Sequence, residues 1–250
     1  MLGNKKLLIR ADDLGFSEAV NYGIEKSVKQ GLIRSVGLMP NMEAAAHGVR
    51  LLDGTGVCMG QHTNICAGRP LTDPGKIPSL VTETGEFKPS KLYRSATEDF
   101  VDLDEVVLEI EAQYQEFIRL TGDEPHYFEG HAVASVNFFK GLEIVANNHG
   151  LKYLAFSMDG SPIKFGNSRV YINMESMNPD YDPFKTLQNI KYHEDGVETL
   201  VCHPGYLDNY ILTHSSLTIP RAMEVEMLCS VQAKEWIKEN EIDTVTYDEL

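Results

Sequence analysis

Short apolar runs alternate with helical patterns along the whole chain. The first run covers residues 6–11 and stops at Asp12 and Asp13, which is typical of a buried strand. A helix is predicted next, with Ser17 as its N-cap and Gly31 as its left-handed stop. Further apolar or β-branched runs predict strands over 33–39, 56–62, 127–129, 152–156, 198–202 and 242–246, with an eighth strand near Val170.

Helices are predicted between most of these strands, over residues 43–52, 102–120, 137–148, 183–192 and 222–238. Residues 68–99 break the alternation with four prolines and three glycines, which favours a functional loop or lid, or else a disordered insertion. Strands separated by such long connections form a parallel sheet. We therefore predict a single α/β domain over 1–250. Its expected form is a closed or partly closed (β/α) barrel of about seven parallel strands, with an open doubly wound sheet as the alternative.

The composition excludes several classes of protein. Hydrophobic residues at 42% and charged residues at 24% are typical of a folded globular chain. The formal charge of −15 disfavours binding to nucleic acid or to an anionic membrane. The four cysteines form no C-x-x-C pair and are expected as buried, reduced thiols. Without a signal-peptide core or an apolar run of about 18 residues, we expect a cytoplasmic protein with no membrane span.

Acidic or imidazole side chains stand at the carboxyl ends of four predicted strands, namely Asp12 with Asp13, His62, His131 and His203. In parallel α/β folds these strand ends converge on the site. One aspartate with His62 and His131 would make a three-ligand site for a divalent cation, with positions left open for water and substrate. The other aspartate could accept a proton from the water that such a cation activates for amide or ester hydrolysis. A turn or helix cap is the alternative interpretation of the aspartate pair.

Three further residues are candidates for the site. His203 lies in Cys-His-Pro-Gly, a sharp turn just past a strand, and is a candidate general acid for a leaving amine. A turn histidine that bonds a backbone carbonyl is the alternative. Arg69 and Arg221 are candidates for holding a polar substrate, with exposed salt-bridging arginines as the alternative. Two imidazoles favour zinc over magnesium, but both cations stay open.

Several motifs resemble those of the YdjC-like carbohydrate deacetylases, which include chitooligosaccharide deacetylases. The matching segments are A-D-D-L-G at 11–15, residues 35–41, G-Q-H-T-N-I at 60–65 with G-R-P at 68–70, residues 78–81 with 85–87, and C-H-P-G at 202–205. They span nearly the whole chain in order. The resemblance implies a (β/α)-barrel-like fold and a metal-dependent deacetylase of N-acetylated sugars.

By the same resemblance, the metal would be held by Asp13, His62 and His131. By analogy with other metal-dependent sugar deacetylases, Asp12 would act as the base and His203 as the acid. Which aspartate is the ligand and which is the base stays open.

The chain departs from the family pattern after its fourth strand. There the family commonly carries D-x-H-x-H-x-H, whereas this chain has Glu-Gly-His-Ala-Val-Ala-Ser over 129–135. The first histidine is His131, but Val133 and Ser135 replace the other two. This difference bears on substrate preference and on activity.

The leading hypothesis is a metal-dependent hydrolase that removes acetyl from a small chitooligosaccharide or its phosphorylated form. One alternative is a catalytically impaired carbohydrate-binding or regulatory relative. Another is a hydrolase of a different small amide or ester. The expected partner is an N-acetylated oligosaccharide substrate, and a homodimer is open. A flavodoxin-like or nucleotide-binding protein is disfavoured because the sequence lacks the glycine-rich phosphate motifs.

Overall fold

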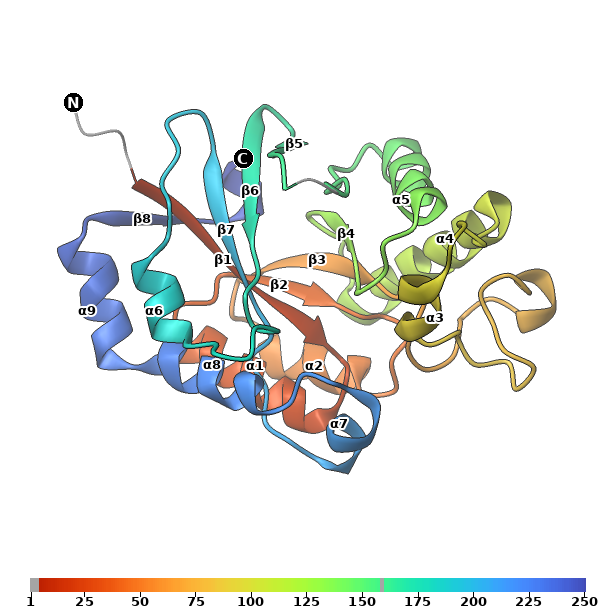
Figure 1. Cartoon of the computed structure of the whole chain (residues 1–250), viewed down its shortest axis with the longest axis horizontal. Helices are drawn as coiled ribbons and strands as arrows, with labels where there is room; N and C mark the ends of the chain where they lie inside the picture. The colour runs from red at the N-terminus through yellow and green to blue at the C-terminus, as the bar shows by residue number, and fades with distance from the viewer. Residues whose placement is uncertain (1–4, 158–159) are drawn as a thin grey trace.

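A curled sheet of mostly parallel strands forms the centre of the fold (Figure 1). The computed structural model describes residues 5–157 and 160–250. Residues 1–4 lie outside the described residues. They begin the segment in which no signal-peptide core was predicted. The strands are β1 (Lys5–Leu14), β2 (Ser35–Leu38), β3 (Cys58–Thr63), β4 (Phe128–Gly130), β5 (Ile163–Phe165), β6 (Ser168–Asn173), β7 (Val197–Cys202) and β8 (Ile242–Val245).

The strand order is β4-β3-β2-β1-β7-β6-β5, and only β5 runs antiparallel to its neighbour in the described sheet. β1 is long enough to pair with β8 along its first half and with β2 along its second half, while β7 lies on its other side. The result is a half-barrel of seven parallel strands with one antiparallel edge strand. The predicted partly closed barrel is confirmed, and the strand expected near Val170 is β6.

Helices cover the sheet and turn their apolar faces towards it. They are α1 (Glu18–Lys29), α2 (Ala45–Leu52), α3 (Ser90–Ser95), α4 (Leu103–Thr121), α5 (Val136–Asn148), α6 (Pro183–Gln188), α7 (Asn209–His214), α8 (Ile219–Cys229) and α9 (Val231–Glu239), with short 3-10 turns η1 (Pro74–Lys76) and η2 (Tyr247–Glu249). α1 packs between α2 and α8, and α4 packs on α5 (Figure 1). Within the described residues, every helix is too short or too polar to cross a membrane.

Two of the predicted elements differ in kind from the structure, and the helix expected over 183–192 ends at Gln188. The strand expected over 152–156 is only a bridge between Tyr153 and Phe128, because β4 offers three residues to pair with and the chain turns outward after Leu154. The helix expected over 222–238 is two helices, α8 and α9. Ser230 separates them in an extended conformation and caps α9 by accepting a hydrogen bond from the Ala233 amide.

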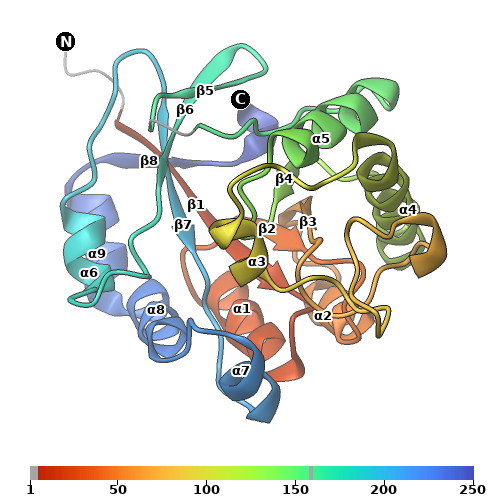
Figure 2. The ribbon, with the colours of Figure 1, turned by 45° about the vertical axis from the view of Figure 1, so that its right-hand side comes forward.

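The proline-rich segment 68–99 is ordered, so the disordered alternative is wrong. It contains η1, a β-bridge and α3, and it buries Ile77, Leu80 and Phe87 in a core that it shares with α4 and α5. The Tyr93 hydroxyl of α3 donates to the Ile65 carbonyl at 2.8 Å, which holds α3 beside the loop after β3 (Figure 2). The segment therefore flanks the carboxyl end of β3.

Candidate active site

A bulge near the end of β1 positions the two aspartates. The β1–β2 register holds at Ala11 and resumes at Leu14, with only Gly37 of β2 opposite Asp12 and Asp13. Asp13 takes a left-handed backbone conformation with φ of 74°. This conformation is costly for a residue other than glycine and is found where surrounding structure enforces it, often at functional sites.

Asp13, His62 and His131 meet at the carboxyl ends of β1, β3 and β4. Asp13 Oδ1 lies 3.2 Å from His62 Nε2 and 3.1 Å from His131 Nδ1, and the two nitrogens are 2.9 Å apart. Ligand atoms around one cation with bonds of about 2.1 Å lie roughly 3 Å apart, so this spacing fits a shared divalent cation. One carboxylate and two imidazoles are also a ligand set that such cations use. The three residues thus form a candidate metal site.

Glu129 of β4 fixes which nitrogen of His62 faces this site. The Nδ1 atom of His62 bonds the Glu129 carboxylate, so in neutral His62, the form that a cation needs, Nδ1 carries the proton and the Nε2 lone pair faces Asp13 and His131. A carboxylate behind a histidine in this way orients metal-ligating imidazoles in proteins. Gly37 leaves room for the pair, because a Cβ there would lie 2.9 Å from Glu129 Oε1.

Arg221 of α8 holds the other oxygen of Asp13. Its Nη2 donates to Asp13 Oδ2 at 2.6 Å, and its remaining donors reach the Leu217 and His203 carbonyls. Burial opposes ionisation of Asp13, but the charge of Arg221, assisted by His131, holds the pKa of Asp13 well below its usual value. Asp13 is therefore an anion throughout the physiological range.

The two imidazoles of the site retain protons when no cation is bound. Burial alone would lower the pKa of His62, but the Glu129 and Asp12 carboxylates raise it well above its ordinary value. For His131, burial is again outweighed, and the Asp13 carboxylate raises the pKa to about 9. Since a bound cation needs neutral imidazoles, binding would release these protons. The pocket attracts positive charge, as a cation site must.

Asp12 lies close to His62 and Glu129 and is paired with Arg10. Arg10 Nε and Nη2 approach the two Asp12 oxygens at 2.6 and 2.8 Å, and Nη2 lies 3.4 Å from Glu129. Asp12, His62 and Glu129 also come close enough to hold a cation. The guanidinium already supplies the positive charge between the two acids, so this second arrangement is unsuited to a metal.

His203 follows β7 at the edge of the site. Its backbone amide donates to Glu224 Oε2 at 2.5 Å, and its Nδ1 lies 3.4 Å from the Ser176 hydroxyl. Burial lowers the pKa of His203 to about 4, against the opposing effect of the Asp13 carboxylate. The imidazole is therefore neutral at pH 7 before substrate binds. Burial also raises the pKa of Glu224 to about 7, although the Tyr181 hydroxyl donates to its other oxygen.

The sequence matches a known protein family over most of its length. Residues 6–239 match the family described as YdjC-like protein. The chain belongs to the YdjC-like family. It is 31% identical to a "Carbohydrate deacetylase 2" of Listeria innocua, with 98% of each chain covered. It is 29% identical to a "Chitooligosaccharide deacetylase" of Escherichia fergusonii, over 93% of this chain and 94% of that one.

Solved structures agree with this assignment at the level of the fold. A protein of Enterococcus faecalis, whose assigned role is cellobiose-phosphate cleavage, superposes with a TM-score of 0.85 at 24% identity and 98% coverage of both chains. A family 4 acetyl xylan esterase of Clostridium thermocellum, solved with a cobalt ion, gives a TM-score of 0.51 at 12% identity. That match covers 98% of this chain and 89% of the esterase. At these identities the likeness shows a shared fold only.

The two positions that depart from the YdjC-like pattern have structural partners here. Val133 is 4% exposed and packs in the apolar core beside α4 and α5. Ser135 is the N-cap of α5, where its hydroxyl accepts from the Phe138 amide and lies 2.9 Å from both oxygens of Asp99. These contacts order the segment that carries His131.

The two arginines predicted to hold a substrate lie in different surroundings. Arg69 follows β3, its side chain is 65% exposed, and its ion-pair partner among the described residues is Glu86 at 4.0 Å. Arg221 is 2% exposed and bonds Asp13 directly. Substrate contact by either arginine stays a prediction, and the geometry gives Arg221 a clear role in positioning Asp13.

Three charged residues of the site were absent from the predicted set. Arg10 and Glu129 lie inside otherwise apolar strands, and a charge in a buried strand is a signal that could have pointed to them. Glu224 sits on a helix with mixed polarity and gave no such signal. Its place in the site is shown by the hydrogen bond that it accepts from the His203 amide, in the turn after β7.

Proposed function

We propose that this YdjC-like protein is a metal-dependent hydrolase that removes the acetyl group from N-acetylated sugars. Small chitooligosaccharides or their phosphorylated forms are the proposed substrates. The observation that carries the proposal is the meeting of Asp13, His62 and His131 within 3.2 Å, backed by Glu129 and Arg221. The names of the deacetylase relatives support the choice of substrate class.

The proposed metal is a divalent cation held by Asp13 Oδ1, His62 Nε2 and His131 Nδ1. Such a cation would polarise the acetamide carbonyl and make an attacking water more acidic. Two imidazoles with one carboxylate favour zinc over magnesium, which prefers oxygen ligands. Arg221 keeps Asp13 ionised and fixed, so the ligands are ordered before the cation arrives.

The protein's own residues would then move one proton. Water adds its oxygen to the acetyl carbon, the carbon–nitrogen bond breaks, and the proton passes to the leaving amine. Asp12 is the proposed acceptor of that proton, and Arg10 holds the carboxylate in place. Because the low pKa leaves His203 neutral at pH 7, His203 can serve as the acid only after it has gained a proton. The proposed transfers are water to Asp12 and protonated His203 to the amine, and the proton count closes because Asp12 then releases its proton to solvent while His203 takes one up from solvent.

Partly exposed apolar side chains near the His203 turn are the proposed contacts of the sugar ring. Tyr206 and Leu207, just past the turn, are each 38% exposed, and Met177, next to Ser176, is 57% exposed. Pyranose rings present apolar C–H faces that pack on such side chains, while the acetamide needs polar groups. This arrangement supports a saccharide as the substrate.

The proposal is tested by acetate release from diacetylchitobiose, measured for the native protein, after chelation, and for His62→Ala. Release is expected from the native protein, with a loss of at least a hundredfold on chelation and in the variant. His149→Ala is the matched control, because His149 also pairs with a carboxylate, Glu111, but lies on the surface. Metal-independent release, or equal release by His62→Ala, would refute the proposal.

Two outcomes would redirect it to the alternatives. Cleavage of O-acetyl esters in preference to N-acetyl groups would keep the same site but change the bond. Saccharide binding without acetate release at saturating zinc would favour a carbohydrate-binding relative. The buried Val133 and the capping Ser135 have structural roles here, so neither residue supports loss of turnover.

A further inference from the structure

A second group of metal-ligating side chains lies on a different part of the sheet from the candidate active site. Cys58 is the first residue of β3, His126 precedes β4, and Asp248 belongs to η2 near the end of the chain. One ligand atom from each lies within 4.8 Å of the others. His126 Nδ1 and Asp248 Oδ1 are already 2.6 Å apart.

The surroundings of Cys58 suit a metal-bound thiolate. Ser35 of β2 is the register partner of Cys58, and its hydroxyl lies beside the Cys58 side chain. Ser35 is fully buried, and its oxygen has no hydrogen-bond partner among residues 5–157 and 160–250. A hydroxyl placed in this way donates to a thiolate better than to a thiol, and such outer partners accompany metal ligands in proteins.

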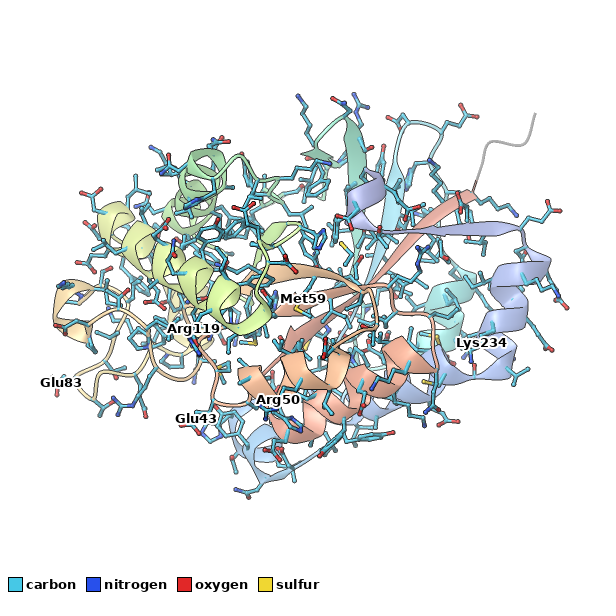
Figure 3. All side chains as sticks on the ribbon, turned by 180° about the vertical axis from the view of Figure 1, so that it is seen from behind. Glu43, Arg50, Met59, Glu83, Arg119 and Lys234 are labelled. Carbon is cyan, nitrogen blue, oxygen red and sulfur yellow. The ribbon has the colours of Figure 1, made fainter. Side chains whose placement is uncertain are left out.

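Two of the three ligands are open to solvent, and the third is buried. Cys58 is 3% exposed, whereas the His126 and Asp248 side chains are 43% and 48% exposed. His126 lines an open cleft between α2 and α4, together with Arg50 and Met59, which Figure 3 labels. The imidazole and the carboxylate are therefore open to a cation from solvent, and the buried sulfur lies within 4.8 Å of both.

We propose that Cys58, His126 and Asp248 bind a thiophilic divalent cation of the zinc class. Thiolate and imidazole together select such cations over magnesium and calcium, and three protein ligands leave one position for water. The cation would balance the negative charges of the Cys58 thiolate and the Asp248 carboxylate, which lie close together. Its role would be structural, because it would tie η2 to the beginnings of β3 and β4.

This site is separate from the candidate active site. Cys58 and His62 lie on the same strand, four residues apart, which is about 13 Å along an extended chain. No ligand is shared between the two groups. The proposal therefore stands or falls independently of the proposed deacetylase activity.

Cobalt titration of the metal-free His62→Ala protein tests the proposal, because this variant removes a ligand of the candidate active site. We expect a near-ultraviolet sulfur-to-cobalt absorption band and a zinc-dependent rise of several degrees in Tm. The band and the Tm rise should both be lost in His62→Ala/Cys58→Ser. In His62→Ala/His126→Gln, the affinity for cobalt should fall at least tenfold. The second variant leaves Cys58 in the core and guards against misfolding of the first.

Two controls keep the result specific. Cys229→Ser, in the same His62→Ala background, alters a half-buried thiol elsewhere, and His149→Gln alters another surface histidine paired with a carboxylate. Both should keep the band and the Tm shift. The absence of a band in the His62→Ala protein, or a band that survives Cys58→Ser, would overturn the proposal.

Discussion

Glu129 provides the sharpest test of how the candidate metal site is organised. Glu129→Gln keeps the shape of the side chain and an acceptor for the His62 Nδ1–H group, but it removes the negative charge. Glu129→Ala also removes the acceptor, so His62 can rotate or present the other nitrogen. Loss of such a partner weakens metal binding by about 10–100-fold, or roughly 1.4–2.7 kcal/mol. We expect the glutamine variant near the lower limit and the alanine variant near the upper limit.

Competition between the protein and a chromophoric chelator for zinc would measure this change at pH 7.5, in a Cys58→Ser background that leaves only the active-site cation. Glu111→Gln is the matched control, because Glu111 accepts from His149 Nε2 at 2.8 Å on the surface. Its affinity for zinc should equal that of the parent. If Glu129→Ala, shown to be folded by its thermal transition, binds zinc as tightly as the parent, the assigned role of Glu129 is wrong.

Three further substitutions test packing, capping and buried charge. Gly23→Ala should lower the free energy of unfolding, measured in urea, by about 1–3 kcal/mol, because the new Cβ would lie 2.4 Å from the Gly205 Cα. Unchanged stability would contradict that close approach. Ser135→Ala should cost about 1 kcal/mol in the same assay, since α5 loses its N-cap and the contact with Asp99, and a neutral result would argue against the cap. Burial raises the pKa of Glu224 to about 7, so the native state holds a proton on Glu224 that the unfolded state has already lost. As the pH rises from 4.5 to 7, the free energy of unfolding of the wild type should therefore fall relative to that of Glu224→Gln, by on the order of 3 kcal/mol. Parallel stability–pH profiles of the two proteins would refute this.

The parallel sheet and the convergence of the aspartate pair with His62 and His131 could be predicted because both depend on local patterns. Most strands coincide with an apolar run, although β5 was not predicted, and parallel connections place the carboxyl ends of the parallel strands at one edge. A residue immediately after such a run, such as His62 or His131, is then placed without any knowledge of its neighbours. The errors arose where a few long-range contacts decide the outcome. Residues 152–156 have strand-like composition, but β4 is too short to pair with more than Tyr153.

The bulge in β1 could not be predicted from the sequence, and it determines which aspartate faces the imidazoles. Regular alternation would place two consecutive residues on opposite faces without saying which one faces His62 Nε2. The register break opposite Gly37 and the left-handed backbone of Asp13 settle the orientation through pairing with β2. Likewise, no pattern along the chain links Arg221 with Asp13, 208 positions away.

Each of the two aspartates has its own arginine, and this division explains why only one side of His62 is suited to a cation. Arg10 contacts both oxygens of Asp12, so the Nδ1 side of His62 already holds a cationic partner. Arg221 contacts only Oδ2 of Asp13, which leaves Oδ1 directed at the imidazoles. Buried charges are retained only when paired, so each acid needs its arginine for the fold to tolerate it. Because the second pairing leaves one oxygen available, the Asp13 side keeps an unshared ligand and the Asp12 side does not.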